Sequence, residues 1–336
     1  MANVRLSARR VPLTPRRKTV TALLFVSPWL VGLATLVLYP FAASLYWSFC
    51  RYDMVSDPQW IGTANYERLG DELLHGGQFA QALRNTCYYA GLSVPLSIVL
   101  GISLALMLSW KVRGQAIFRT LFFLPSVVPV VATAVLWTWL LDPTDGMVNH
   151  LLSAVGLPGG GWFNSHREVL SATDWSATIS SLQSGRHALL PLGSKDALVL
   201  MSLWGVGNFM VIYLASIGDI PSQLYEAAEL DGAGPLRRLR HVTLPMLSPV
   251  IFFNLVMGLI QAVQAFTQIY LVSDGQGGPA GSTMVLSLHL FLTAFKELDM
   301  GYASAMAWVL FVFVLLVTVA LFRTSRHWVH YQGAAR

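Results

Sequence analysis

Long apolar runs alternate with polar segments along the whole chain. Six such runs are found, at residues 21–49, 87–110, 118–141, 197–217, 245–272 and 303–322. Each reaches the length of about 20 residues that an α-helix needs to cross the hydrocarbon core of a bilayer. Prolines inside the runs are compatible with helices, because neighbouring helices can satisfy the carbonyl groups that a proline frees. The pattern therefore predicts an all-α membrane protein with six transmembrane helices.

The composition supports this class, and the distribution of charge sets the orientation. Hydrophobic residues make up 54% of the chain and charged residues 12%, against about 25% charged residues in soluble proteins. Of 22 Lys and Arg residues, 15 lie in the N-terminal segment, around the turn between the second and third runs, after the fourth run and in the C-terminal tail. The other segments hold 13 of the 17 acidic residues. Because basic residues collect on the cytoplasmic side, both termini are predicted to be cytoplasmic, and the net charge of +5 does not indicate nucleic-acid binding.

The polar segment between the fourth and fifth runs has strong local signals for two short helices. Strong helix formers occupy 226–230. The sequence Asp-Gly-Ala-Gly at 231–234 breaks this helix, and Gly232 is expected at a positive φ. Pro235 can open a second helix, for which 244–245 is the expected stop. A bent pair of short amphipathic helices is shaped to fit a groove of another protein.

This segment resembles the coupling loop of ABC importer permeases. The matching residues are Glu226, Ala227, Ala228, Asp231, Gly232, Leu244 and Pro245. Three more stretches resemble the carbohydrate-uptake branch of that family, which includes the maltose, glycerol-3-phosphate and multiple-sugar importers. They are Asn85-Thr86, Arg119-Thr120-Leu121-Phe122-Phe123-Leu124-Pro125 and Gly277-Gly278-Pro279. The N-terminal run resembles that of the first-permease type in a two-permease system.

The resemblance implies a fold, partners and a location. The fold is the type I permease architecture of ABC importers, with six transmembrane helices and a cytoplasmic helix-turn-helix coupling loop at 219–245. The partners are a second related permease, an ATPase subunit dimer that binds ATP and Mg²⁺, and an extracytoplasmic substrate-binding protein. This chain is then a transport subunit of the bacterial cytoplasmic (inner) membrane, surrounded by membrane lipid. It is expected to bind no cofactor and to have no ATPase site of its own.

Uncharged polar side chains inside two of the runs indicate where a substrate could pass. The candidates are Trp204, Asn208, Asn254, Gly258, Gln261, Gln264 and Gln268. Those of the fifth run form one stripe at 100° per residue, with Gln264 at its edge. Amide groups suit the hydroxyl groups of a sugar or sugar-like polyol, and Trp204 can stack on a sugar ring. The alternatives are hydrogen bonds that only hold the helices together and a Trp204 that is a core or interfacial residue.

Two other function classes were weighed against a permease. An intramembrane enzyme acting on a lipid-linked sugar needs a catalytic acid–base pair or a metal set, and no convergent set of either kind is found in the sequence. A stand-alone secondary carrier usually needs an ionisable group at the middle of a span, and the runs carry none near their centres. Cys50 and Cys87 are the only cysteines, and two unpaired thiols are favoured over a single disulfide.

The chain divides into four parts on this interpretation. A basic arm, 1–20, is followed by the first span and a polar loop, 21–84. The transmembrane domain covers 85–326, and a short cytoplasmic tail, 327–336, ends the chain. Within the domain, the segment 164–195 is longer than the resemblance leads one to expect.

Overall fold

The computed structural model describes residues 15–110, 114–183 and 192–330. Parts of the predicted basic arm (1–14), of a basic turn (111–113), of the long segment (184–191) and of the tail (331–336) lie outside the described residues. The α-helices are α1 (Pro15–Gly32), α2 (Tyr39–Ser48), α3 (Ala64–His75), α4 (Gln78–Ser109), α5 (Gln115–Phe123), α6 (Val130–Leu140), α7 (Met147–Ala154), α8 (Ala172–Gln183), α9 (Ser194–Trp204), α10 (Gly207–Gly218), α11 (Ser222–Leu230), α12 (Pro235–Arg238), α13 (Leu244–Val263), α14 (Thr267–Val272), α15 (Leu286–Phe295) and α16 (Met300–Ser325). Between them lie the π-helical turns η1 (Leu33–Leu38) and η4 (Leu239–Thr243), the 3₁₀ turns η2 (Leu124–Val127), η3 (Trp162–Asn164) and η5 (Pro279–Gly281), and the antiparallel strands β1 (Cys50–Arg51) and β2 (Gln59–Trp60).

The helices match the six predicted spans, four of them as long helices and two as bent pairs. The long helices are Ala22–Ser48, Gln78–Ser109, Pro235–Val263 and Met300–Ser325. The third span is bent by 97° between η2 and α6, and the fourth by 46° between α9 and α10. In the third span, Val128 is extended with ψ 130°, because the residue before a proline avoids the helical region.

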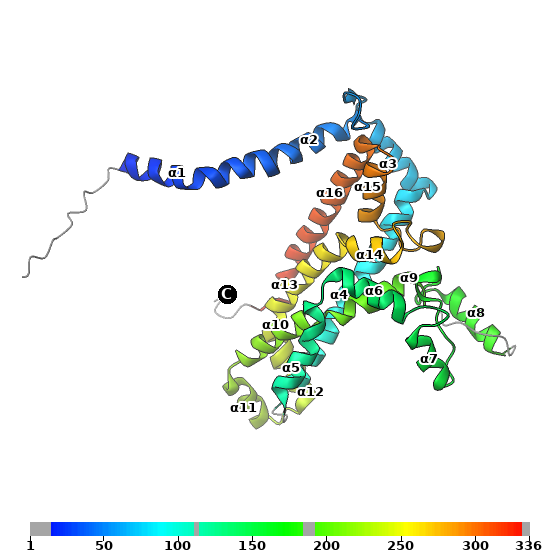
Figure 1. Cartoon of the computed structure of the whole chain (residues 1–336). Helices are drawn as coiled ribbons and strands as arrows, with labels where there is room; N and C mark the ends of the chain where they lie inside the picture. Colours follow the sequence, from blue (N-terminus) through cyan, green and yellow to red (C-terminus); the bar gives the residue numbers. More distant parts are fainter. Residues whose placement is uncertain (1–14, 111–113, 184–191, 331–336) are drawn as a thin grey trace, which may run out of the picture.

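The central helix of the body is α4, which packs against α9, α10, α13 and α15 (Figure 1). Its contact with α10 is close because small residues face that helix. A Cβ atom at Gly101 would lie 3.2 Å from the Cβ atom of Phe209. One turn further on, Ala105 is fully buried against Met210 and Tyr213. Two helix backbones can approach in this way without a side chain between them.

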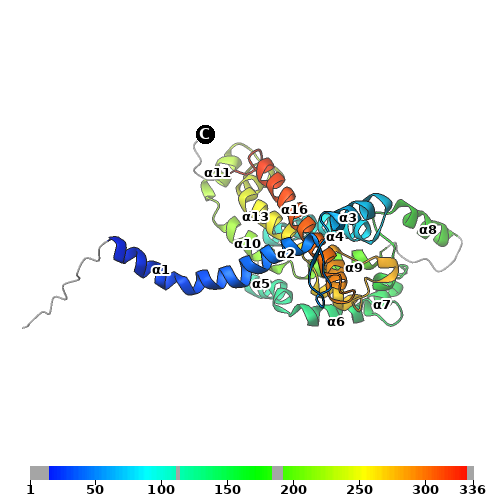
Figure 2. The same cartoon turned by 90° about the horizontal axis from the view of Figure 1, so that it is seen from above.

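The first span leaves the body, as Figures 1 and 2 both show. Its last part, α2, is anchored on α16, where the ring centroids of Phe41 and Trp308 lie 4.6 Å apart and the Trp308 indole N–H donates to Ser44 Oγ at 3.3 Å. No residue in the apolar window of Ala22–Ser48 is buried. Within the described part of the chain, this span therefore has a long apolar surface that meets lipid or another protein.

The expected stop at Leu244-Pro245 is wrong. The helix that begins at Pro235 continues through η4 and α13 to Val263, as one helix of 29 residues. A proline in a helix clashes with the carbonyl group four residues earlier. For Pro245 that group belongs to His241, which lies in the wide π turn of η4, and this turn makes room for the proline ring.

The segment between the fifth and sixth runs, for which the sequence pattern predicts a polar loop at 274–300, contains a helix, α15, so this prediction is wrong. This helix packs between α16 and α4, and Leu288, Thr293 and Ala294 on it are buried. Its run of ten residues is too short to cross a membrane, so hydropathy alone gives no sign of it.

The two cysteines lie in different environments. Cys50 is buried in β1, whereas Cys87 is exposed on α4. Both are free thiols in the structure.

The contact between α10 and the third span gives a test of the packing. A Cβ atom at Gly207 would lie 2.1 Å from the carbonyl oxygen of Phe122 and 2.8 Å from Cα of Phe123. Gly207→Ala is therefore expected to destabilise the protein by about 2 kcal/mol, the usual cost of overpacking a core. Thermal unfolding of the purified protein in detergent measures this effect. Gly218→Ala, in the same helix with no neighbour within 4 Å, is the control, and an equal melting temperature for both variants would contradict the packing.

Candidate functional site

A cavity of about 460 Å³ opens beside α4, between the halves of the two bent spans and the end of α13. This volume lies in the range of about 300–1,000 Å³ that is typical of small-molecule sites. Six of the seven predicted substrate-path residues line it: Trp204, Asn208, Asn254, Gly258, Gln261 and Gln268. Gln264 is exposed and is not among the described residues that line the cavity.

The helix α13 supplies the amide wall as far as Gln261. Asn254 is 1% exposed, and its side-chain Nδ2 has no hydrogen-bond partner among the described residues. Because an unpaired buried amide is costly, this group needs a partner, which can be the neighbouring Tyr213 hydroxyl or a ligand or water molecule in the cavity. One turn further on, Gly258 allows α4 to approach closely, since a Cβ atom there would lie 3.3 Å from Cγ1 of Val94.

The predicted stripe does not continue along a single helix. α13 ends at Val263, and Gln268 belongs to α14 beyond the break. The break is stabilised from α15, where the Ser287 hydroxyl donates to the carbonyl oxygen of Ala265. Gln268 still reaches the cavity, and its Nε2 donates to the Tyr89 hydroxyl of α4 at 2.7 Å. The expectation of one continuous stripe is therefore wrong for 264–268, although Gln268 lines the same cavity as Gln261.

Hydroxyl groups complete the lining, and the sequence interpretation missed them. They belong to Tyr89, Ser93, Ser97, Ser126, Thr133, Ser202 and Thr267. The first three follow one another at every fourth position of α4, which is a polar stripe that helical periodicity could have detected. The rings of Trp204, Phe209 and Phe266 add aromatic surface. Trp204 packs edge-on against Trp137, with their ring centroids 6.1 Å apart.

The described residues that line the cavity carry no charge. Among the described residues that line it, no Asp, Glu, Lys, Arg or His occurs. In the same described part of the chain, no group of three or more His, Cys, Asp or Glu side chains is placed to hold a metal ion. The arrangement can donate and accept neutral hydrogen bonds and can stack on a ring, which suits recognition of a polar, uncharged molecule.

At one end of the body, α11 and α12 form the bent helix pair that the sequence predicts (Figure 1). Gly232 has φ +72°, so the prediction of a positive φ is confirmed. The Gly232 N–H donates to the carbonyl oxygen of Glu229 at 3.0 Å, and the Ala233 N–H donates to that of Ala228 at 2.9 Å. These two bonds form a Schellman motif, which ends α11 and turns the chain toward α12.

The pair is also held by side chains. The Tyr225 hydroxyl lies 3.0 Å from Oγ1 of Thr243, and Arg238 pairs with Glu229 at 3.3 Å. Glu226 and Ala227 are exposed on the outer side of the turn. Beside them, Leu230 is 90% exposed and Leu236 is 77% exposed. Exposed leucines next to a free carboxylate are typical of a surface that binds another protein.

Comparison with known proteins places the chain in a family. Its residues 97–328 match the family described as "Binding-protein-dependent transport system inner membrane component". The chain belongs to this family. The permease is 39% identical to the probable ABC transporter permease protein YesP of Bacillus subtilis (strain 168), over 95% of its own length and 94% of that protein. It is 32% identical to the lactose transport system permease protein LacF of Rhizobium radiobacter, over 91% and 94% of the two chains.

A solved structure has the same fold as the permease. It is the crystal structure of a bacterial ABC transporter involved in the import of the acidic polysaccharide alginate, with a TM-score of 0.71 and 23% identity over 93% of the permease and 96% of that chain. The predicted resemblance to the permeases of sugar ABC importers is confirmed by the family match and the relatives. Neither an intramembrane enzyme nor a stand-alone carrier is favoured by these relatives.

Proposed function

We propose that the permease forms half of the translocation path for a sugar or sugar-like polyol, and that the cavity beside α4 is the substrate site of this half. The observation that supports this most is the lining of hydroxyl, amide and aromatic groups without a charged side chain among the described residues. Sugars present many hydroxyl groups and apolar ring faces, and such a lining matches both. LacF is named for lactose transport, and a neutral sugar fits the uncharged half-site of the permease.

The pair α11–α12 is proposed as the contact with a separate ATPase dimer. Glu226, Ala227 and Ala228 would face a groove of the ATPase, with Asp231 and Gly232 setting the turn. The exposed Leu230 and Leu236 would supply the apolar part of the contact. ATP and Mg²⁺ would be held by that ATPase, and the permease itself would have no ATPase site and no cofactor. Closure of the dimer would move the helix pair and with it the spans around the cavity.

A second, related permease is proposed to complete the path. One coupling loop offers one docking site, whereas a closed ATPase dimer presents two. Most apolar side chains of α1 are exposed among the described residues, and a partner permease or lipid would bury them. An extracytoplasmic substrate-binding protein would deliver the sugar to the opposite side.

The orientation and the division of the chain are part of the same proposal. Both termini would be cytoplasmic, in the bacterial inner membrane. The basic arm 1–20, the first span with its loop 21–84, the transmembrane domain 85–326 with the coupling loop 219–245, and the tail 327–336 would be its parts. The positive-inside distribution of Lys and Arg supports this orientation.

Reconstitution tests this function. The permease alone in liposomes is expected to take up neither lactose nor sn-glycerol 3-phosphate. Co-expression with the partner permease and the ATPase is expected to give a complex that purifies together, and adding the binding protein is expected to start ATP-dependent uptake of the neutral sugar. Uptake by the permease alone would contradict the assembly. If the complex takes up only sn-glycerol 3-phosphate, the proposal that the uncharged cavity binds a neutral sugar is contradicted.

A further inference from the structure

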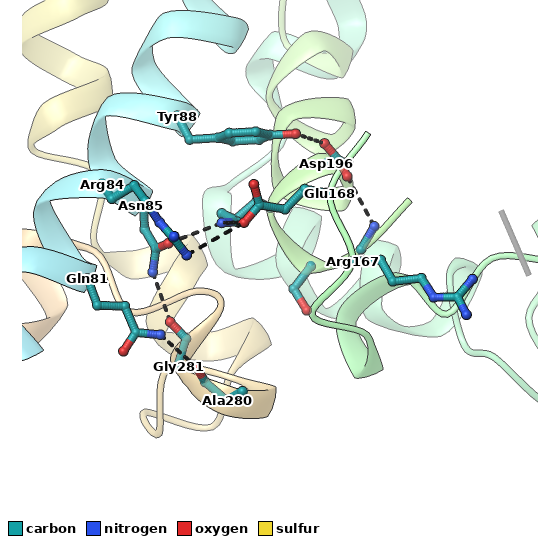
Figure 3. Close-up of polar contacts among 12 residues, drawn as sticks. Gln81, Arg84, Asn85, Tyr88, Arg167, Glu168, Asp196, Ala280 and Gly281 are labelled. Atoms are coloured by element: carbon teal, nitrogen blue, oxygen red, sulfur yellow. Dashed lines mark hydrogen bonds and ion pairs between the residues drawn. The ribbon is translucent and has the colours of Figure 1, made fainter. Parts of the chain in front are cut away.

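A buried lysine lies where the outer segment joins the membrane-spanning body. The outer segment is defined here as residues 142–183, on the side that the positive-inside pattern makes external. Lys195 near the start of α9 is 2% exposed, and its amino group donates to Oδ1 of Asn85 at 3.2 Å and to the carboxylate of Glu168. Figure 3 shows Arg84 of α4 pointing toward Glu168 of the outer segment. A buried ammonium group is stable only when it is paired in this way.

The next residue, Asp196, reaches the same two elements. Its Oδ1 accepts a hydrogen bond from the Tyr88 hydroxyl at 2.5 Å (Figure 3). Its Oδ2 accepts from the N–H groups of Val169 at 3.0 Å and Gly193 at 3.1 Å. Two consecutive residues of α9 therefore bind both α4 and the outer segment. We call Asn85, Tyr88, Glu168, Lys195 and Asp196 the outer clamp.

The clamp holds backbones as well as side chains. The Ser194 N–H donates to the carbonyl oxygen of Ser165 at 2.9 Å. A Cβ atom at Gly193 would lie 2.1 Å from the carbonyl oxygen of Arg167, so the two chains touch there and only glycine fits. On its other side, Asn85 donates from Nδ2 to the carbonyl oxygens of Gly281 and Met284, both at 2.8 Å. The side-chain amide of Asn85 in α4 thus contacts two segments that are distant in sequence, α9 and residues 281–284.

The clamp is continuous with the wall of the cavity. α9 runs from Lys195 to Met201 and Trp204, which line the cavity, and α4 runs from Asn85 to Tyr89, which also lines it. Phe163 of η3 belongs to the same buried cluster as Met201 and Tyr89. A displacement of the outer segment would therefore be transmitted to α9 at both the polar and the apolar contact.

We propose that Lys195 is a positioning residue that carries the contact of an external binding protein from the outer segment, through Glu168 and Asn85, to the α9 wall of the cavity. This inference rests on the proposed function for the identity of the partner. A buried ion pair suits this role because its geometry is directional. The outer segment, α9 and α4 therefore keep one relative arrangement when the binding protein displaces the outer segment.

The test compares one single and two double variants in the complete importer. Lys195→Met leaves the Glu168 carboxylate at a largely buried site with only Arg84 nearby, at 3.8 Å, and is expected to lower the melting temperature. Lys195→Met with Glu168→Met removes both charges and is expected to restore it, because no charge is left stranded. Lys296→Met with Glu297→Met, at two exposed residues, removes the same charges and is the control.

Two readouts separate positioning from stability. Hydrogen exchange of the 193–204 backbone, which needs no substrate, is expected to quicken in the Lys195–Glu168 double variant and not in the control. The binding-protein concentration that half-maximally stimulates the ATPase is expected to rise about tenfold in that double variant, a size usual for coupled neighbours. If the Lys195–Glu168 double variant has a restored melting temperature and a wild-type value of either the exchange rate or the half-maximal binding-protein concentration, the inference is overturned. A wild-type complex that ignores the binding protein would instead contradict the proposed function, and the exchange experiment would still decide whether Lys195 positions α9.

Discussion

Sugar transport by the assembled importer is expected to fall about tenfold or more when Gly232 is replaced by valine. The backbone there has φ +72°, and a β-branched side chain at such a φ costs roughly 1–2 kcal/mol. No atom lies within 4 Å of a Cβ placed at Gly232, so the cost comes from the backbone and not from a clash. The turn would relax by changing the angle between α11 and α12, which would displace Glu226 from the ATPase groove.

The neighbouring glycine supplies a matched control. Gly234 has φ −66° and ψ 170°, which valine adopts readily, and it too has no neighbour within 4 Å. Membrane abundance, ATPase co-purification and uptake should be measured on Gly232→Val and Gly234→Val together. The first variant is expected to be inserted normally and to lose uptake, and the second to transport like the wild type. Equal uptake by the two variants would remove the turn from the coupling mechanism.

A second variant tests the proposed ionic contact in the same assay. Glu226 is exposed and has no ion pair among the described residues, so Glu226→Leu changes little within the permease. In the assembled importer, the substitution would leave a basic group of the ATPase without its partner, which would weaken the contact by about 3 kcal/mol. Glu229→Leu, which removes only the exposed pair with Arg238, is expected to have a small effect. A larger loss of uptake in Glu229→Leu than in Glu226→Leu would contradict the assignment.

The coupling segment could be predicted well because its signals are local. Helix formers before 231, a glycine at 232 and a proline at 235 act over a few residues, and the structure has both helices and the positive φ at their break. The wrong stop at 244–245 has a local cause as well. A proline is a helix breaker by itself, but the π turn η4 before it absorbs the distortion.

The cavity could be predicted only in part. Helical periodicity brings Asn254, Gly258 and Gln261 to one face, and these three do line the cavity. Periodicity fails after Val263 because the break depends on a hydrogen bond from Ser287, more than twenty residues further along the chain. Neither glycine nor proline occurs at 264–266 to signal a break.

The outer clamp could not be predicted from the sequence, because its residues lie far apart along the chain. Lys195 and Asn85 are 110 residues apart, and each is an ordinary polar residue near the end of an apolar run. In the sequence, only a family resemblance points to Asn85, and Lys195 lies in a polar outer segment. Their meeting is set by the packing of α9 on α4, which no short-range pattern encodes.

The substrate concentration for half-maximal uptake is expected to rise about thirtyfold when Gln261 and Gln268 are both replaced by leucine. Both amides line the cavity from opposite sides of the helix break. Each hydrogen bond to a sugar hydroxyl contributes about 1 kcal/mol, and two together give a factor of about thirty. Tyr89→Phe should be measured as well, since the Gln268 amide donates to its hydroxyl and leucine at 268 leaves that hydroxyl without this partner.

Gln264 gives the matched control for this experiment. It is exposed and is not among the described residues that line the cavity, so Gln264→Leu makes the same chemical change three residues from Gln261 without touching the site. Uptake by Gln264→Leu is expected to match the wild type, and basal ATPase activity and assembly should be equal in all variants. If the double variant instead keeps its affinity for sugar but unfolds at a lower temperature, the amides hold the helices together and the substrate contacts lie elsewhere in the cavity. A lower affinity, with a melting temperature no lower than that of Tyr89→Phe, which breaks only the bond between Gln268 and Tyr89, is the outcome that the uncharged, hydroxyl-rich lining predicts, because the remaining lost hydrogen bonds are then made with the sugar.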